Sequence, residues 1–191
     1  REKPLAATTT LAVPIVAEPD PRLTGLTIPA EAPARGAHLE HPWQDLVAAM
    51  RASTVKVAAA EHAALFQGVG KPEVFAFGSF YLSGTLNDRP LADLRADLSA
   101  LGLGRDEGRM ETEDHVSFVL EVMRYLIAGD DVAVCNLEQQ RRFFRSHVQS
   151  WLERLCAATE AHPRAQLWVA VARFTQAYIE VETQGFDLLE A

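Results

Sequence analysis

The chain is poor in cysteine and has no long uninterrupted apolar run. Its two cysteines, Cys135 and Cys156, are too few for a disulfide framework. Both fall in apolar, helix-like surroundings, where a buried thiol behaves as a small hydrophobe. A run of about 18 apolar residues, which a membrane-spanning helix requires, is absent, so we expect no stable membrane insertion. Together these features favour a reducing, cytoplasmic location.

Basic residues are in the minority, with 18 Lys and Arg against 26 Asp and Glu, for a net charge of −8. A nucleic-acid-binding domain needs a basic footprint, so this balance argues against a nucleic-acid partner. It is compatible with a basic peptide partner, because opposite potentials favour encounter. Apolar residues make up 48% of the 191 residues, which is ordinary for a globular chain with a sizeable core.

The alternating pattern of β-strands persists nowhere in the sequence. Residues 1–42 hold seven of the ten prolines, which predicts a proline-rich, partly irregular N-terminal segment. From Trp43 onward apolar residues recur at helical spacing, with Ser53 or Thr54, and Pro90, at predicted helix starts. One helix is predicted to begin at residue 43 and a second to cover residues 54–65. Further helices are predicted over about 75–86, 91–101, 113–128, 134–161 and 163–181.

This pattern predicts an all-α fold, a single-domain helical bundle of about seven or eight helices. We expect residues 43–191 to form the helical domain, with an N-terminal half to about 110, a hinge over 104–115 and a C-terminal half to 191. Two long apolar faces are predicted, one of Leu137, Phe144, Val148, Trp151, Leu152 and Leu155, the other of Leu167, Val171, Phe174, Tyr178 and Val181.

Three blocks of sequence carry the most information about function: residues 81–91, 111–115 and 140–151. The middle block, Glu-Thr-Glu-Asp-His, places three carboxylates and an imidazole at the predicted start of an apolar helix. Acidic side chains are favoured in a first helical turn by the unpaired backbone N–H groups and the helix dipole. In the third block, Phe143, Phe144, His147 and Trp151 are interpreted as core residues.

Over about residues 65–186 the chain resembles the TorD/DmsD/NarJ family of chaperones for molybdenum-containing oxidoreductases. The resemblance rests on the order and spacing of residues 81–103, of the middle and third blocks, and of residues 120–127. Where the family commonly has proline after the first glutamate of the middle block, this chain has Thr112.

The resemblance implies an all-helical, TorD-like cytoplasmic protein of anaerobic respiration that is not an enzyme. Family members bind the twin-arginine signal peptide or the body of an apo-molybdoenzyme and hold back export until the cofactor is inserted. The implied partner is therefore a molybdenum-containing oxidoreductase subunit or its twin-arginine signal peptide. Some members are linked to guanine nucleotides and some form domain-swapped dimers, so a homodimer stays open.

The candidate peptide-binding residues are Phe77, Phe80, Tyr81, Leu82, Glu111, Asp114 and His115. Asp114 would accept hydrogen bonds from an arginine guanidinium, and His115 would orient that carboxylate or contact peptide backbone. In the alternative interpretation, Asp114 caps backbone N–H groups and His115 packs in the hinge. The aromatic residues would line an apolar groove for the peptide, or they belong to the core.

No residue is assigned to catalysis, to a cofactor or to a metal. Glu111 and His115 have the i,i+4 spacing of helical metal ligands, but the Glu-x-x-His pairs of a di-iron bundle are missing. Gly68–Lys71 lacks the remaining residues of a phosphate-binding loop. Two alternatives to a chaperone stay open: a helical nucleotide- or metal-dependent enzyme, and a scaffold or regulator that uses the same groove.

Overall fold

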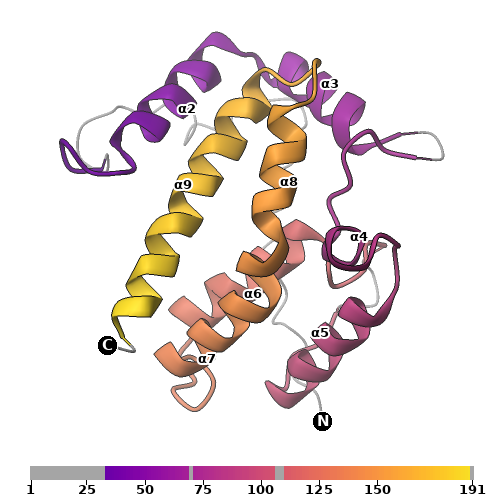
Figure 1. Cartoon of the computed structure of the whole chain (residues 1–191), viewed down its shortest axis with the longest axis vertical. Coiled ribbons are helices and arrows are strands. Elements are labelled where there is room, and N and C mark those ends of the chain that lie inside the picture. Colours follow the sequence, from indigo (N-terminus) through magenta and orange to yellow (C-terminus); the bar gives the residue numbers. More distant parts are fainter. Residues whose placement is uncertain (1–32, 69–70, 106–109, 190–191) are drawn as a thin grey trace. The chain divides into compact units, whose positions relative to one another are not determined.

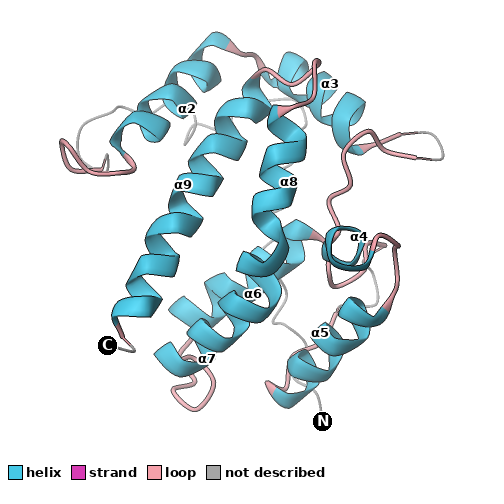
Figure 2. Ribbon diagram, viewed as in Figure 1, coloured by secondary structure: helices cyan, strands magenta, loops and turns pink. Residues whose placement is uncertain are grey.

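The computed structural model describes residues 33–68, 71–105 and 110–189. These residues form helices and connecting turns, with one isolated β-bridge and no strand among them (Figure 2). The predicted all-α fold is therefore confirmed. The helices are α2 (Glu40–Ala52), α3 (Val55–Phe66), α4 (Gly78–Ser83), α5 (Arg89–Ala100), α6 (Val116–Ala128), α7 (Leu137–Phe143), the π-helix η1 (Phe144–Gln149), α8 (Ser150–Glu160) and α9 (Leu167–Leu188). The irregular segment predicted for residues 1–42 lies outside the described residues as far as residue 32.

The chain divides into two compact units. Of the described residues, the first unit holds 76–105 and 110–152, and the second unit holds 33–68, 71–75 and 153–189. Helices α7, η1 and α8 follow one another without a break in the chain. The hinge expected over 104–115 falls within the first unit and stays a prediction.

The second unit is built around α9. Helix α2 runs beside α9, and the ring centroid of Trp43 lies 5.7 Å from that of Phe174 (Figure 1). Helix α3 also contacts α9. From α3, the Glu61 carboxylate accepts hydrogen bonds from the backbone N–H groups of residues 166–168 at 2.6, 3.2 and 3.0 Å. These bonds satisfy N–H groups that the start of a helix leaves unpaired, and they place a negative charge at the positive end of α9.

Two helix starts predicted from the sequence, at Thr54 and at Pro90, lie close to real helix starts. Thr54 caps α3, since its hydroxyl oxygen accepts a hydrogen bond from the N–H of Val57 at 3.3 Å. Asp88 caps α5 through a 2.7 Å hydrogen bond from the N–H of Arg89, and Pro90 lies in the first turn. Proline is accepted there because its missing N–H would have no partner within the helix.

The core of the first unit is made by one face each of α5, α6 and the α7–η1 helix. Three leucines of α5, Leu91, Leu94 and Leu98, are all at most 3% exposed, whereas Leu101 at the end of that helix is only half-buried. Helix α6 contributes a wider apolar face, of which Val122 and Leu126 are completely buried. Phe143, Phe144 and Trp151 are also buried, which confirms their interpretation as core residues.

Several helix boundaries differ from the sequence prediction, and two of the differences fall among the candidate residues. The helix predicted over 75–86 forms only as α4, because Phe77 is extended and Gly84 ends the helix in the left-handed region at φ 84°. The helix predicted from 113 begins at Val116, after its cap His115. The acidic residues of 111–114 therefore precede α6 instead of occupying its first turn, which holds no acidic residue. The expectation that these acids occupy the first turn of that helix was wrong.

The long helix predicted over 134–161 exists over 137–160, but its middle is the π-helix η1. Single π-helical turns inside α-helices reset the direction of the side chains that follow, and they are frequent at functional sites. The predicted stripe of this helix holds apart from Leu137, which is 59% exposed at the first turn. The spacing of apolar residues cannot show whether another helix packs over the first turn of α7.

The predicted apolar face of α9 is only partly correct. Tyr178 is 42% exposed, whereas the most buried residues of α9 are Ala170, Ala172, Ala177, Ile179 and Phe186. Helices α2 and α3 both contact α9, so its burial is not confined to one stripe. No helix among the described residues combines the length and apolar content needed to cross a membrane.

Candidate functional site

Residues 76–79 and 112–116 lie side by side in the first unit. The N–H of Gly78 donates to the carbonyl oxygen of Asp114 at 2.8 Å, and the N–H of Val116 donates to that of Ala76 at 2.9 Å. These bonds make Phe77 and His115 an isolated antiparallel β-bridge. The structure thus brings together two groups of candidate residues that are separated by more than 30 positions in the sequence.

Asp114 is the most tightly held of the candidate residues. It is 4% exposed, and its Oδ2 accepts hydrogen bonds from the N–H and the hydroxyl of Ser79 at 2.9 and 2.5 Å. Its Oδ1 accepts a hydrogen bond from the hydroxyl of Thr112 at 2.6 Å. The carboxylate therefore holds the first turn of α4, which is the geometry of the capping alternative. The predicted contact with a peptide arginine stays a prediction.

His115 caps α6 and also packs against an aromatic ring. Its Nδ1 accepts a hydrogen bond from the N–H of Ser117 at 3.2 Å and lies 2.7 Å from the Ser117 hydroxyl. Its ring meets that of Phe77 edge to face, with centroids 5.0 Å apart. Both side chains are half-buried, so one part of this pair still faces solvent.

The remaining aromatic candidates lie on α4. The rings of Phe80 and Tyr81 meet edge to face at 5.3 Å, and Tyr81 stacks on the buried ring of Trp151 at 6.0 Å. Leu82 is 40% exposed, and Leu86 in the following turn is 43% exposed. Helix α4 therefore presents an apolar, partly aromatic surface, although part of each ring serves the core.

The two other acidic residues of the middle block have different surroundings. Glu111 is exposed, whereas Glu113 is only 8% exposed and was not singled out from the sequence. Oε2 of Glu113 accepts hydrogen bonds from Nε and Nη2 of Arg95 at 3.0 and 2.8 Å, and Arg105 Nε lies 3.5 Å from Oε1. Nothing in the local sequence links these residues, which only the fold brings together.

The ionisation of Glu113 follows from these contacts. Burial by itself raises the pKa of a carboxyl group. Against burial act the hydrogen bond from Arg95, a backbone hydrogen bond and the charges of Arg95 and Arg105, and together they hold the pKa of Glu113 below its ordinary value. Glu113 is therefore a stably charged residue that ties α5 to the entry of α6.

A second polar cluster, also missed from the sequence, joins α5 to η1. Asp97 Oδ1 accepts a hydrogen bond from Arg142 Nη2 at 2.8 Å, and Oδ2 lies 2.7 Å from His147 Nε2. The carbonyl oxygen of His147 accepts the indole N–H of Trp151 at 2.7 Å. The π-helix places His147 in this position, and no spacing rule applied to the sequence includes such a turn.

The described residues offer little support for a metal site or for a reactive cysteine. It contains no group of three or more His, Cys, Asp or Glu side chains placed to hold a metal ion. Both cysteines are free. Burial, followed by the charges of Glu160 and Glu153, raises the pKa of Cys156 to about 12, so its thiol stays protonated. The Cys135 thiol, in the turn before α7, donates to the carbonyl oxygen of Tyr125 at 3.3 Å.

The sequence is similar to one known protein family and to several chaperones. The family model for the nitrate reductase delta subunit matches residues 33–157. Chaperone protein TorD of Vibrio cholerae serotype O1 is 26% identical over 138 residues, which cover 69% of this chain and 63% of that relative. Chaperone protein TorD of Vibrio parahaemolyticus serotype O3:K6 is 23% identical over 137 residues, covering 65% and 62%. The chain thus spans less than two thirds of the length of these relatives. No solved structure matches it significantly.

Proposed function

The chain belongs to the nitrate reductase delta subunit family, whose model covers more than half of it, and on this basis we propose that it is a molybdoenzyme maturation chaperone. Its client is the twin-arginine leader or the body of an apo-molybdoenzyme, which it holds until the cofactor is inserted before export or assembly. Chaperones of the TorD type are the relatives that carry this proposal.

The single structural observation that supports the proposal is the joining of residues 76–82 to residues 111–116. We define the α4 surface as the seven candidate residues Phe77, Phe80, Tyr81, Leu82, Glu111, Asp114 and His115. Its apolar part includes Leu82, which is 40% exposed, and the Phe77–His115 ring pair. An apolar lining of this kind is what a hydrophobic peptide segment requires.

Two different roles follow for the acidic residues of the α4 surface. The Asp114 carboxylate already accepts three hydrogen bonds, so its role is to hold the first turn of α4 in place. Glu111 is exposed, and we assign to it the contact with the leader arginines. Because full desolvation of an ion pair is costly, this contact sets encounter and specificity more than affinity.

Calorimetry with a panel of twin-arginine leader peptides tests the proposal. We expect Leu82→Ser to weaken binding about tenfold, through loss of apolar contact worth ~1.4 kcal/mol. The matched control is Leu120→Ser on α6, since Leu120 is 42% exposed and lies outside the α4 surface. Replacing both leader arginines by lysine should also weaken binding, because lysine cannot form a bidentate pair with a carboxylate.

The proposal fails if none of the peptides binds and no molybdenum-containing subunit co-purifies with the protein from its native host. Equal losses in Leu82→Ser and Leu120→Ser would leave the chaperone function standing but would remove the α4 surface as the binding site.

A further inference from the structure

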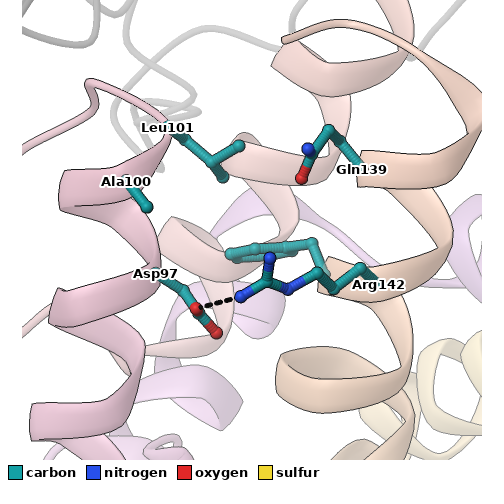
Figure 3. Close-up of a pocket in the computed structure, with 6 residues that line it drawn as sticks. Asp97, Ala100, Leu101, Gln139 and Arg142 are labelled. Atoms are coloured by element: carbon teal, nitrogen blue, oxygen red, sulfur yellow. Dashed lines mark hydrogen bonds and ion pairs between the residues drawn. The ribbon is translucent and has the colours of Figure 1, made fainter.

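A small pocket in the first unit lies between α5 and α7, apart from the α4 surface (Figure 3). Its volume is about 230 Å³. Sites for drug-sized ligands usually span ~300–1,000 Å³, so this pocket matches one side chain or a small organic molecule. It is lined by Asp97, Ala100, Leu101, Gln139, Arg142 and Phe143.

The Arg142 side chain is held across this pocket by Asp97. Arg142 Nη2 donates to Asp97 Oδ1 at 2.8 Å, while His147 Nε2 lies 2.7 Å from the other carboxylate oxygen. Figure 3 shows the guanidinium extending from α7 toward Asp97 on α5. A guanidinium carries five N–H donors, and the bond to Asp97 occupies one of them. The other donors have no partner among the described residues.

A second polar group in the pocket is also unused. The Gln139 side chain makes no hydrogen bond within the described part of the chain, although it is half-buried at the pocket. Its amide group can donate as well as accept. Arg142 and Gln139 are three residues apart on α7, so both side chains project from the same side of the helix. The pocket therefore contains more hydrogen-bond donors than hydrogen-bond acceptors that could pair with them.

Local charge decides which ligand these donors suit. Although the whole chain has a net charge of −8, residues 137–149 carry three arginines and one glutamate. The Asp97 carboxylate is already shared by Arg142 and His147. Among the residues that line the pocket, an incoming cation would meet Arg142 and a carboxylate that is already shared, whereas an anion would find guanidinium donors that Asp97 does not occupy. The arginines of a leader peptide are thus unsuitable occupants.

We propose that this pocket binds a carboxylate on a short apolar stem. Arg142 contacts the carboxylate, Gln139 donates a further hydrogen bond, and Leu101 and Phe143 cover the stem. Charge-assisted bonds from arginine to a carboxylate are short and directional, which gives the site its selectivity for an acid over a neutral analogue. This site does not depend on the proposed chaperone function.

Titration with butyrate, followed by ¹⁵N NMR of arginine Nε groups and backbone amides, tests the proposal. We expect saturable shifts at residues 100–101 and 139–143 with butyrate and none with butyramide, which has the same shape without the charge. Equal shifts with both compounds, or no saturable shift with butyrate, would overturn the proposal.

Two variants check the role of Arg142. Arg142→Gln should weaken butyrate binding at least tenfold, about 1.4 kcal/mol. The matched control is Arg89→Gln, which removes the same charge from α5 at a side chain that is 87% exposed and outside the pocket. Gln139→Glu places a carboxylate of the chain itself beside Arg142 and should abolish butyrate binding while the thermal melt is unchanged. Undiminished binding in either pocket variant contradicts the proposal.

The source of the carboxylate is decided by a second pair of probes. Acetylglutamate amide carries a side-chain carboxylate as a polypeptide does, and acetylglutamine amide is its neutral control. Binding of acetylglutamate amide at least as tight as that of butyrate assigns the pocket to an acidic side chain of a polypeptide. Binding of butyrate alone assigns it to a free carboxylic acid.

Discussion

At the scale of single residues, Gly78 shows how a close approach fixes a residue type. A Cβ at this position would lie 2.9 Å from Cε2 and 3.0 Å from Nε1 of the Trp151 indole. Trp151 is 2% exposed and is held by its hydrogen bond to the carbonyl oxygen of His147, so the ring cannot withdraw easily. Glycine at the start of α4 is thus required by packing against the core.

We predict that Gly78→Ala destabilises the protein by about 1–3 kcal/mol, the usual cost of overpacking a core. Urea denaturation measures the loss in free energy of unfolding. The control is Gly185→Ala in α9, where a Cβ would meet nothing within 4 Å. Because glycine within a helix is less favourable than alanine, Gly185→Ala should stabilise by about 0.5–1 kcal/mol. Equal effects of the two substitutions would contradict this account of Gly78.

At the scale of elements, the buried Glu113 joins α5 to the segment that enters α6. Arg95 lies on α5 and Arg105 follows that helix, so one carboxylate holds both to the residues before α6. Burial raises the pKa of the Glu113 carboxyl group and the two arginines lower it, and the net result is a lowered pKa. A lowered pKa in the folded state makes stability depend on pH.

We predict that Glu113→Gln lowers the free energy of unfolding by about 1–3 kcal/mol at neutral pH. Unfolded chains bind the proton near the ordinary value of 4.5, and the folded chain binds it only at lower pH. The contribution of Glu113 is therefore complete above that value and is lost as the pH falls through the folded pKa. Denaturation curves of wild type and variant should converge in acid.

The control for this experiment is Glu111→Gln, which removes the same charge from an exposed position. It should change stability by less than about 0.5 kcal/mol at any pH, as surface substitutions usually do. A gap between wild type and Glu113→Gln that persists unchanged in acid would show that the charge of Glu113 is not its source.

At the scale of the whole molecule, the two free cysteines report on unfolding. Cys156 is 3% exposed on α8, and burial and nearby acids raise its pKa to about 12. Cys135 is half-buried in a turn, outside any helix. Because the thiolate is the reactive species, burial protects Cys156 both by excluding reagents and by keeping the proton in place.

We predict that iodoacetamide modifies Cys135 in the native protein and modifies Cys156 only when urea unfolds the chain. Mass spectrometry after timed labelling measures both rates, and Cys135→Ser isolates the signal of Cys156. The labelling of Cys156 should follow the same urea dependence as the loss of helical circular dichroism. Rapid labelling of Cys156 without urea would mean that the region around α8 opens locally under native conditions.

The sequence by itself determined the helical fold and most helix positions. Apolar spacing identified α2, α3, α5 and α9, and Thr54 and Pro90 mark real helix starts. These features depend on neighbours within one or two turns, which a sequence displays directly. The block at 111–115 was also recognised as informative, although the expectation that its acids begin α6 was wrong.

Only the tertiary structure decided what the polar residues do. The Asp114 carboxylate is occupied by Ser79, which lies 35 positions earlier in the chain, and Glu113 is paired with Arg95. The π-helix that brings His147 to Asp97 has no signature in the periodicity. Charged side chains are placed by long-range contacts, whereas helices arise from local ones. A sequence can therefore indicate which residues matter without showing which of them face a partner.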